Sequence, residues 1–229
     1  MKIGGLQKLT LLDFPGRCAC TVFTVGCNLR CPFCHNAPLV TGQEPALIGE
    51  DEILSLLKKR QGVLDGVCFT GGEPLLQPDL AALIREIRAL GFAVKLDTNG
   101  TLPDRLQTLL DEGLLDYVAM DIKNSPERYA ETVDVPGFDV TNIDRSIRIL
   151  QNGNVPFEFR TTVVKELHTP KDFQQIAEWI AGDEPYFLQQ FVDSGDLIES
   201  GFSACSKAEM EGFLPLISPK VPRVAIRGV

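Results

Sequence analysis

The sequence has little histidine and a shortage of positive charge. Its 229 residues include only two histidines, His35 and His168, and 22 lysines and arginines against 31 acidic residues, for a net charge of −9 at pH 7. Binding to nucleic-acid phosphates needs a basic face, so this balance argues against a nucleic-acid partner. It suits an anionic membrane surface equally poorly. Neither a serine nucleophile elbow nor a Walker phosphate loop occurs in the chain.

Long hydrophobic runs are also lacking. No stretch reaches the apolar length of a membrane span, and the first five residues lack the apolar core of a secretory signal. We therefore expect a cytoplasmic protein. In that reducing compartment its seven cysteines should be thiols or metal ligands, and their odd number argues against a complete disulfide framework.

What the chain does contain is a compact group of three cysteines, Cys27, Cys31 and Cys34. Three thiolates on so short a segment can face one metal centre, but they leave a four-iron cluster one ligand short, because fully ligated ferredoxin-type clusters take four cysteines. The iron without a protein ligand is then open for chemistry. The alternatives are a structural zinc site completed by His35, a disulfide, or thiols that are simply buried.

After the cysteine loop, which is expected to end near Gly49, predicted strands alternate with predicted helices. Six core strands are expected, at residues 18–25, 67–70, 93–98, 117–123, 157–164 and 186–192. Strands and helices that alternate with short links predict an α/β fold with a parallel sheet. This sheet could be an incomplete (β/α)6 barrel or an open doubly wound sheet.

The whole chain, residues 1–229, is expected to form a single domain. Residues 1–17 would add an N-terminal strand or hairpin, and residues 206–229 a C-terminal helix and strand. The sequence Ser125-Pro126-Glu127 predicts the start of a helix, with serine as the N-cap and proline at the first helical position.

Polar residues follow several of the predicted strands. In parallel α/β folds, functional groups gather at the carboxyl ends of the strands, so these residues should form one site. Glycines at 71 and 72 could let the backbone approach a ligand, with carbonyls that accept hydrogen bonds from an ammonium group; the alternative is a tight turn with a capping Glu73. Asp97, Asp121 and Lys123 could equally belong to structural ion pairs.

The motifs together resemble the radical S-adenosylmethionine (radical SAM) superfamily. The resemblance rests on Cys27-x3-Cys31-x2-Cys34 with Phe33 before the third cysteine, and on Gly71-Gly72-Glu73-Pro74 after the second strand. Residues 96–100 and 120–123 are similar to glycyl-radical-enzyme activases. Residues 3–16 and 188–191 most resemble the activating proteins of anaerobic ribonucleoside-triphosphate reductase.

This resemblance implies one [4Fe–4S] cluster on the three cysteines, with SAM bound to its fourth iron. Gly71, Gly72 and Glu73 would receive the amine of SAM. Phe33 and His35 would lie along its adenine. The remaining contacts implied are Asp121 and Lys123 with the ribose and carboxylate, Arg160 as a further SAM contact, and a monovalent cation at Asp97, Thr98 and Asp121.

The implied activity is reductive cleavage of SAM to methionine and a 5′-deoxyadenosyl radical, which abstracts hydrogen from a glycine of a partner glycyl radical enzyme. The expected partners are anaerobic ribonucleotide reductase and a flavodoxin or ferredoxin-type electron donor. Alternatives are an activase of the pyruvate formate-lyase type, a carboxy-deazaguanine synthase type of enzyme acting on a small molecule, and a non-catalytic metal-binding protein. No cysteine occurs between Cys34 and Cys68, so further clusters are not expected.

Overall fold

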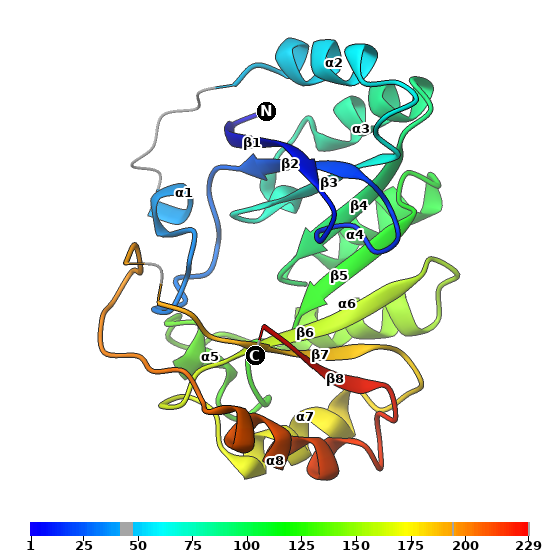
Figure 1. The fold of residues 1–229 in the computed structure, drawn as a ribbon. Helices are drawn as coiled ribbons and strands as arrows, with labels where there is room; N and C mark the ends of the chain where they lie inside the picture. The colour runs from blue at the N-terminus through cyan, green and yellow to red at the C-terminus, as the bar shows by residue number, and fades with distance from the viewer. Residues whose placement is uncertain (42–47, 194, 229) are drawn as a thin grey trace.

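A computed structural model describes residues 1–41, 48–193 and 195–228 and contains one eight-stranded sheet (Figure 1). The strands follow one another in the sheet in chain order, from β1 at one edge to β8 at the other. A doubly wound sheet reverses its strand order, so this order matches the incomplete barrel. The strands are β1 (Ile3–Thr10), β2 (Ala19–Thr24), β3 (Gly66–Gly71), β4 (Ala93–Thr98), β5 (Tyr117–Asp121), β6 (Phe157–Val163), β7 (Tyr186–Gln190) and β8 (Val224–Arg227).

Strands β2 to β8 are parallel, and β1 pairs antiparallel with β2. The prediction of six parallel core strands, β2 to β7, is confirmed, and β8 continues the parallel arrangement. The interior strands read as continuous apolar runs because parallel strands are covered on both faces. In β3, for example, Val67, Cys68 and Phe69 are all fully buried.

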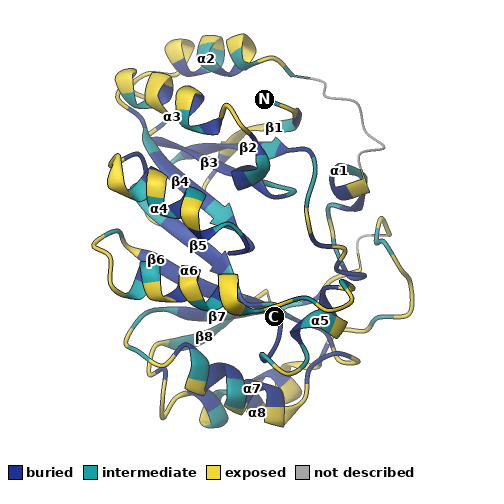
Figure 2. Cartoon of the chain, turned by 180° about the vertical axis from the view of Figure 1, so that it is seen from behind, coloured by how far each residue is buried: buried dark blue, intermediate teal, exposed yellow. Residues whose placement is uncertain are grey.

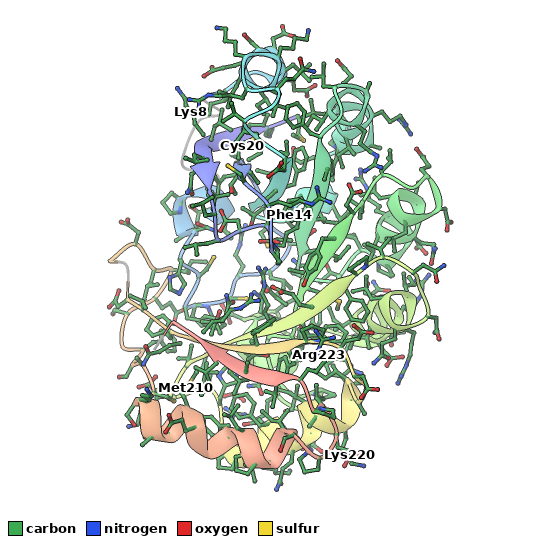
Figure 3. All side chains as sticks on the ribbon, turned by 45° about the vertical axis from the view of Figure 1, so that its right-hand side comes forward. Lys8, Phe14, Cys20, Met210, Lys220 and Arg223 are labelled. Carbon is green, nitrogen blue, oxygen red and sulfur yellow. The ribbon has the colours of Figure 1, made fainter. Side chains whose placement is uncertain are left out.

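The longer helices lie on the outer side of the curved sheet (Figure 1). Their buried stripes face the strands and their exposed faces point outward (Figure 2); in α3 the stripe is Leu80, Leu83, Ile84 and Ile87. Side chains fill the space between the sheet and α7 and α8, where Met210 is fully buried (Figure 3). The helices are α1 (Ala37–Thr41), α2 (Glu50–Lys59), the 3₁₀ turn η1 (Pro74–Leu76), α3 (Leu80–Ala89), α4 (Pro103–Asp111), α5 (Tyr129–Thr132), α6 (Thr141–Gln151), α7 (Pro170–Trp179) and α8 (Lys207–Ile217). Across the described ranges, no helix is both long enough and apolar enough to cross a bilayer.

The helix start predicted at Ser125 is wrong. Residues 126–128 form a turn, and α5 begins only at Tyr129. The Ser125 hydroxyl donates instead to Asp172 Oδ1 at 2.9 Å, on α7, and its N–H donates to Asn124 Oδ1 at 2.7 Å. A tertiary contact has therefore replaced the local cap that the sequence favoured.

One face of the sheet carries several charged residues. Side chains two positions apart on a strand point to the same face, so Lys95 and Asp97 of β4 share a face, as do Glu158 and Arg160 of β6. The register places Asp121 of β5 directly opposite Arg160. Charges from three neighbouring strands therefore meet on the face that the helices do not cover.

Candidate active site

A cavity of about 250 Å³ lies at the carboxyl ends of the parallel strands. Its walls are the cysteine loop and residues at or just after the ends of β3 to β7. Every site residue predicted from the sequence lines this cavity, with the exception of Glu73. The structure therefore brings together residues from positions 27 to 160 that only the fold makes neighbours.

The cysteine loop presents three thiols to the cavity. Cys27, Cys31 and Cys34 line it, whereas the other four cysteines do not, and all seven are free thiols. Arg30 fixes the loop, because its N–H donates to Val133 O at 3.0 Å and its Nη1 donates to Val40 O at 2.7 Å. Three thiols without a fourth beside them fit a [4Fe–4S] cluster that keeps one iron open. Residues 42–47 of the predicted loop lie outside the described residues.

Two N–H groups point at the first of these sulfurs. Leu29 N–H and Asn99 Nδ2 donate to Cys27 Sγ at 3.4 and 3.6 Å. Hydrogen bonds to ligand sulfurs are one way in which proteins set the potential of an iron–sulfur cluster. Burial raises the pKa of Cys27, and it raises the pKa of Cys31 to about 12. Both thiols therefore need a metal or another positive charge to ionise near neutral pH.

Among the described residues, no three His, Cys, Asp or Glu side chains are close enough together to share one metal ion. Ligands of a structural zinc ion must converge on a single point. A four-iron cluster instead takes one thiolate on each of three different irons, so its ligands are spread around it.

The glycines at 71 and 72 are required by the protein's own backbone. A Cβ on Gly72 would lie 2.0 Å from the carbonyl oxygen of Gly26, at the base of the cysteine loop. A Cβ on Gly71 would lie 2.5 Å from Thr24 N, and Gly71 has a φ of +105°, which disfavours other residues. Both glycines also line the cavity. Close packing of β3 against β2 thus accounts for them before any ligand is considered.

Glu73 points away from the cavity into the protein. Its Oε1 accepts from Leu75 N at 3.0 Å and Thr98 Oγ1 at 2.9 Å, and its Oε2 accepts from Asn99 N at 2.7 Å. Burial raises its pKa to about 7, although these three donors act in the opposite direction. Glu73 here caps η1 and ties β3 to the end of β4, as the turn alternative anticipated. Its contact with the amine of SAM remains a prediction.

Five charged side chains form what we call the cavity cluster: Lys95, Asp97, Asp121, Lys123 and Arg160. Arg160 bridges the two carboxylates, with Nη1 3.1 Å from Asp97 Oδ2 and Nε 3.0 Å from Asp121 Oδ1. Lys123 Nζ lies 2.9 Å from Asp121 Oδ2, and Lys95 Nζ lies 2.5 Å from Asp97 Oδ1. The ion pairs left open as an alternative for Asp97, Asp121 and Lys123 are thus present.

The ion pairs favour the charged forms of Asp97, Asp121 and Lys123. Burial alone would raise the pKa of Asp121, but Lys123 and Arg160 lower it to about 2. Arg160 and Lys95 lower the pKa of Asp97 against the same effect of burial. Burial would lower the pKa of Lys123, but Asp121 and Cys31 outweigh it and raise that pKa. The wall of the cavity therefore carries fixed charges near neutral pH.

A second group, the Glu158 cluster, lies on the same face of the sheet but does not line the cavity. It consists of Tyr117, Glu158 and Arg227. Arg227 binds Glu158 with two nitrogens, at 2.8 and 3.0 Å, and Tyr117 Oη donates to Glu158 Oε2 at 3.0 Å. The Arg227 guanidinium also stacks on Phe187, 3.2 Å from the ring centroid. Glu158 lies two residues before Arg160 on β6, so the cluster is farther from the carboxyl ends of the strands than Arg160 is.

The two predicted adenine contacts, Phe33 and His35, are held by other aromatic rings. Phe33 packs edge-on against Phe202 with ring centroids 6.5 Å apart, and His35 packs against Phe191 at 5.5 Å. Burial lowers the pKa of His35, and the positive charge of Lys123 lowers it further. A neutral imidazole and a phenyl ring therefore flank the cysteine loop, and both line the cavity.

Sequence reasoning missed several polar residues of the cavity wall. They are Asn36, Thr70, Asn99, Thr162 and Gln189. Most of them sit at the carboxyl end of a strand, which was the available signal. Asn99 stands out, because its side chain donates both to Cys27 Sγ and, at 3.1 Å, to Asn28 Oδ1.

Comparison with known proteins identifies the family to which this chain is similar. The model of the radical SAM superfamily matches residues 21–180. A Methanocaldococcus jannaschii protein named as a candidate glycyl-radical enzyme activating enzyme is 33% identical over 193 residues, covering 82% of this chain and 79% of its own. A 7-carboxy-7-deazaguanine synthase of Methanopyrus kandleri is 32% identical over 74% of this chain and 71% of its own. The pyruvate formate-lyase-activating enzyme of Clostridium pasteurianum is 28% identical over 75% and 72%.

Solved structures share the fold. The structure of Streptococcus suis SuiB bound to precursor peptide SuiA superposes with a TM-score of 0.70 at 12% identity, covering 91% of this chain and 48% of that one. A domain of a pyruvate-formate lyase-activating enzyme from Bacteroides vulgatus gives a TM-score of 0.57 at 19% identity, covering 71% of this chain and 99% of that domain. At these identities the likeness concerns the fold alone.

Proposed function

The chain belongs to the radical SAM superfamily, and we propose that within it the protein activates a glycyl radical enzyme. The family implies a [4Fe–4S] cluster and SAM. The observation that carries the proposal is the cavity, which among the described residues holds three thiols beside a wall of fixed charges. Two relatives named for activase function support it.

In this proposal Cys27, Cys31 and Cys34 would hold the cluster and would leave one iron for SAM. When bound and reduced, the cluster would supply the electron for reductive cleavage of SAM to methionine and a 5′-deoxyadenosyl radical. The protein's contribution is to bind and orient the cofactor and to keep water out of a reaction in which the cofactor does the difficult chemistry. Backbone atoms of Gly71 and Gly72 would receive the amine.

The charged wall suits the carboxylate and ribose of the same molecule. The cavity cluster contains three cations and two carboxylates, so it offers one net positive charge to an anionic group. Lys123 would contact the carboxylate of SAM and Asp121 its ribose. Phe33 and His35 would flank the adenine, which stacks readily on neutral rings.

The partner that we propose is anaerobic ribonucleotide reductase, with a flavodoxin or ferredoxin-type protein as electron donor. The motif resemblance at residues 3–16 and 188–191 supports this choice. A second candidate is an enzyme of the carboxy-deazaguanine synthase type, because a relative of that name is nearly as similar as the activase relative.

The first test is SAM cleavage. The protein is reconstituted anaerobically with iron and sulfide, reduced with dithionite, and assayed for 5′-deoxyadenosine. We expect cleavage by the wild type and a loss of at least a hundredfold in Cys31→Ala, with iron content reduced. Cys18→Ala is the matched control, since Cys18 does not line the cavity, and it should behave as wild type. Equal cleavage by wild type and Cys31→Ala would contradict the proposal.

The second test identifies the substrate class. The reconstituted protein is incubated with SAM and anaerobic ribonucleotide reductase, and the mixture is examined by EPR spectroscopy. An activase should produce a glycyl-radical doublet that disappears in a reductase whose radical glycine is changed to alanine. Deoxyadenosine that forms in excess only with a deazaguanine precursor would instead favour the second candidate.

A further inference from the structure

Lys95 is the one member of the cavity cluster that the sequence did not point to. It lies in the middle of β4, two residues before Asp97, and its side chain is 2% exposed. Its Nζ lies 2.5 Å from Asp97 Oδ1 and 3.9 Å from Cys68 Sγ. An ammonium with so little access to water is stable only beside a compensating charge, which Asp97 supplies.

Each carboxylate oxygen of the cluster already has a cationic side chain as its partner. Asp97 Oδ1 is bound by Lys95 and Asp97 Oδ2 by Arg160. Asp121 Oδ1 is bound by Arg160 and Asp121 Oδ2 by Lys123. Each of the four oxygens therefore already has a protein cation within 3.1 Å.

This arrangement does not fit the monovalent cation that the resemblance implied at Asp97, Thr98 and Asp121. A metal ion on Asp97 would share a carboxylate oxygen with the positively charged group of Lys95 or Arg160, which repels it. The hydroxyl of Thr98 donates to Glu73 Oε1 at 2.9 Å and accepts from Gly100 N at 3.1 Å, which leaves one lone pair for any other contact. The Lys95 ammonium carries the same unit charge as such an ion and occupies the same carboxylate.

We propose that Lys95 is a built-in counter-ion that replaces a monovalent metal ion in this site. By neutralising Asp97 it leaves Arg160 free to bridge to Asp121, and so holds the charged wall in one geometry. Lys95 is a positioning residue, since it does not line the cavity and would act through Asp97. The inference rests on the proposed function only for its effect on SAM; the charge arrangement itself is independent of it.

The test compares potassium with a cation too large for the site. Thermal unfolding of the protein without cluster is measured in KCl and in tetramethylammonium chloride at equal ionic strength. We expect the Tm of the wild type to be the same within 1 °C in the two salts. Lys95→Met should have a lower Tm and regain about 2 to 4 °C in KCl with a saturable dependence, as a weak ligand of the folded state would give in a protein of this size.

The double variant Lys95→Met/Asp97→Asn is the matched control. It lacks both the ammonium and the carboxylate, so potassium should no longer stabilise it over tetramethylammonium. A saturable potassium effect on the wild type would overturn the proposal, even if Lys95→Met failed to fold. Lys95→Met without any selective response to potassium would overturn it as well.

A second readout concerns SAM itself. The Kd of SAM for the reconstituted protein should be independent of potassium in the wild type, and should improve at least threefold with potassium in Lys95→Met. Failure of the proposed function would appear as absence of SAM cleavage in every variant. Failure of the present inference would appear in the salt comparison of the cluster-free protein, which requires no SAM.

Discussion

The cavity cluster and the Glu158 cluster lie one layer apart on the same face of the sheet and use charge differently. Strand β6 supplies a residue to each, Arg160 to the first and Glu158 to the second. In the Glu158 cluster one carboxylate meets one guanidinium, with a tyrosine hydroxyl and an aromatic ring completing the contacts. In the cavity cluster three cations surround two carboxylates.

The difference separates stabilisation from ligand binding. A charge-balanced pair whose hydrogen bonds are satisfied needs no ligand to neutralise it, so we expect it to stabilise the fold and not to bind a ligand. An unbalanced group with one excess positive charge next to a cavity attracts an anion. Two residues on one strand can thus serve different purposes because of what lies on the neighbouring strands.

The largest expected effect is that of Arg160→Met, which would break the cavity cluster at its centre. Both Asp97 and Asp121 would lose a partner while remaining mostly buried, which typically costs about 3 to 5 kcal/mol. Urea unfolding of the cluster-free protein measures this loss, and SAM cleavage should fall in parallel.

Arg160→Lys is the matched control for that variant. A single ammonium cannot present two separated nitrogens to two carboxylates, so its stability should lie between those of wild type and Arg160→Met. Wild-type stability in Arg160→Met would show that the bridge is dispensable and that the two clusters do not differ as described.

Glu73 extends the comparison, because among the described residues it is a buried carboxylate that accepts hydrogen bonds but has no cationic partner. Its folded pKa of about 7 lies above its ordinary 4.5, so the folded state holds this proton more tightly than the unfolded state. Stability from this group is therefore complete below pH 4.5 and is lost as pH rises to about 7. The loss should amount to about 3 kcal/mol.

The measurement is the free energy of unfolding of the cluster-free protein at several values between pH 4.5 and 8, for wild type and Glu73→Gln. The variant should be less stable at the acid end, since an amide cannot accept all three hydrogen bonds, and its curve should be flatter. Parallel curves for the two proteins would mean that the three donors keep Glu73 ionised throughout this range.

A smaller effect is expected for Glu158→Gln in the other cluster. Arg227 would lose its carboxylate, but its side chain is 39% exposed and can turn to water. We expect a loss of about 1 to 2 kcal/mol in urea unfolding, because screening by solvent weakens such a pair. SAM cleavage per folded molecule should match the wild type. A loss of cleavage comparable with that of Arg160→Met would erase the distinction between the clusters.

The alternation of strands and helices could be predicted from the sequence because each element carries its own local signal. The site followed from the same reasoning, since parallel strands place their carboxyl ends at one edge and polar residues occur there. Ser125 shows where this fails: its local signal for a helix start was overridden by Asp172, 47 positions away in the chain.

Lys95 could not have been placed from the sequence, and for Glu73 the sequence left a ligand contact and a capping role as alternatives. Lys95 has the appearance of an ordinary polar residue in a strand, and only the register with β5 and β6 reveals that it shares a buried face with Arg160 and Asp121. Glu73 sits in a motif expected to contact a ligand, yet three donors from η1 and the end of β4 turn its carboxylate inward. Both outcomes depend on residues that are distant in sequence.

The contact between Gly72 and Gly26 bears on how related sequences should be interpreted. A methyl group at residue 72 would lie 2.0 Å from the Gly26 carbonyl oxygen, so any larger residue would push the cysteine loop off the sheet. Natural selection would then retain glycine at this position even in a descendant that had stopped using its cofactor. An invariant glycine at position 72 is therefore evidence that two backbone segments pack closely together. Evidence for catalysis must come from the cysteines.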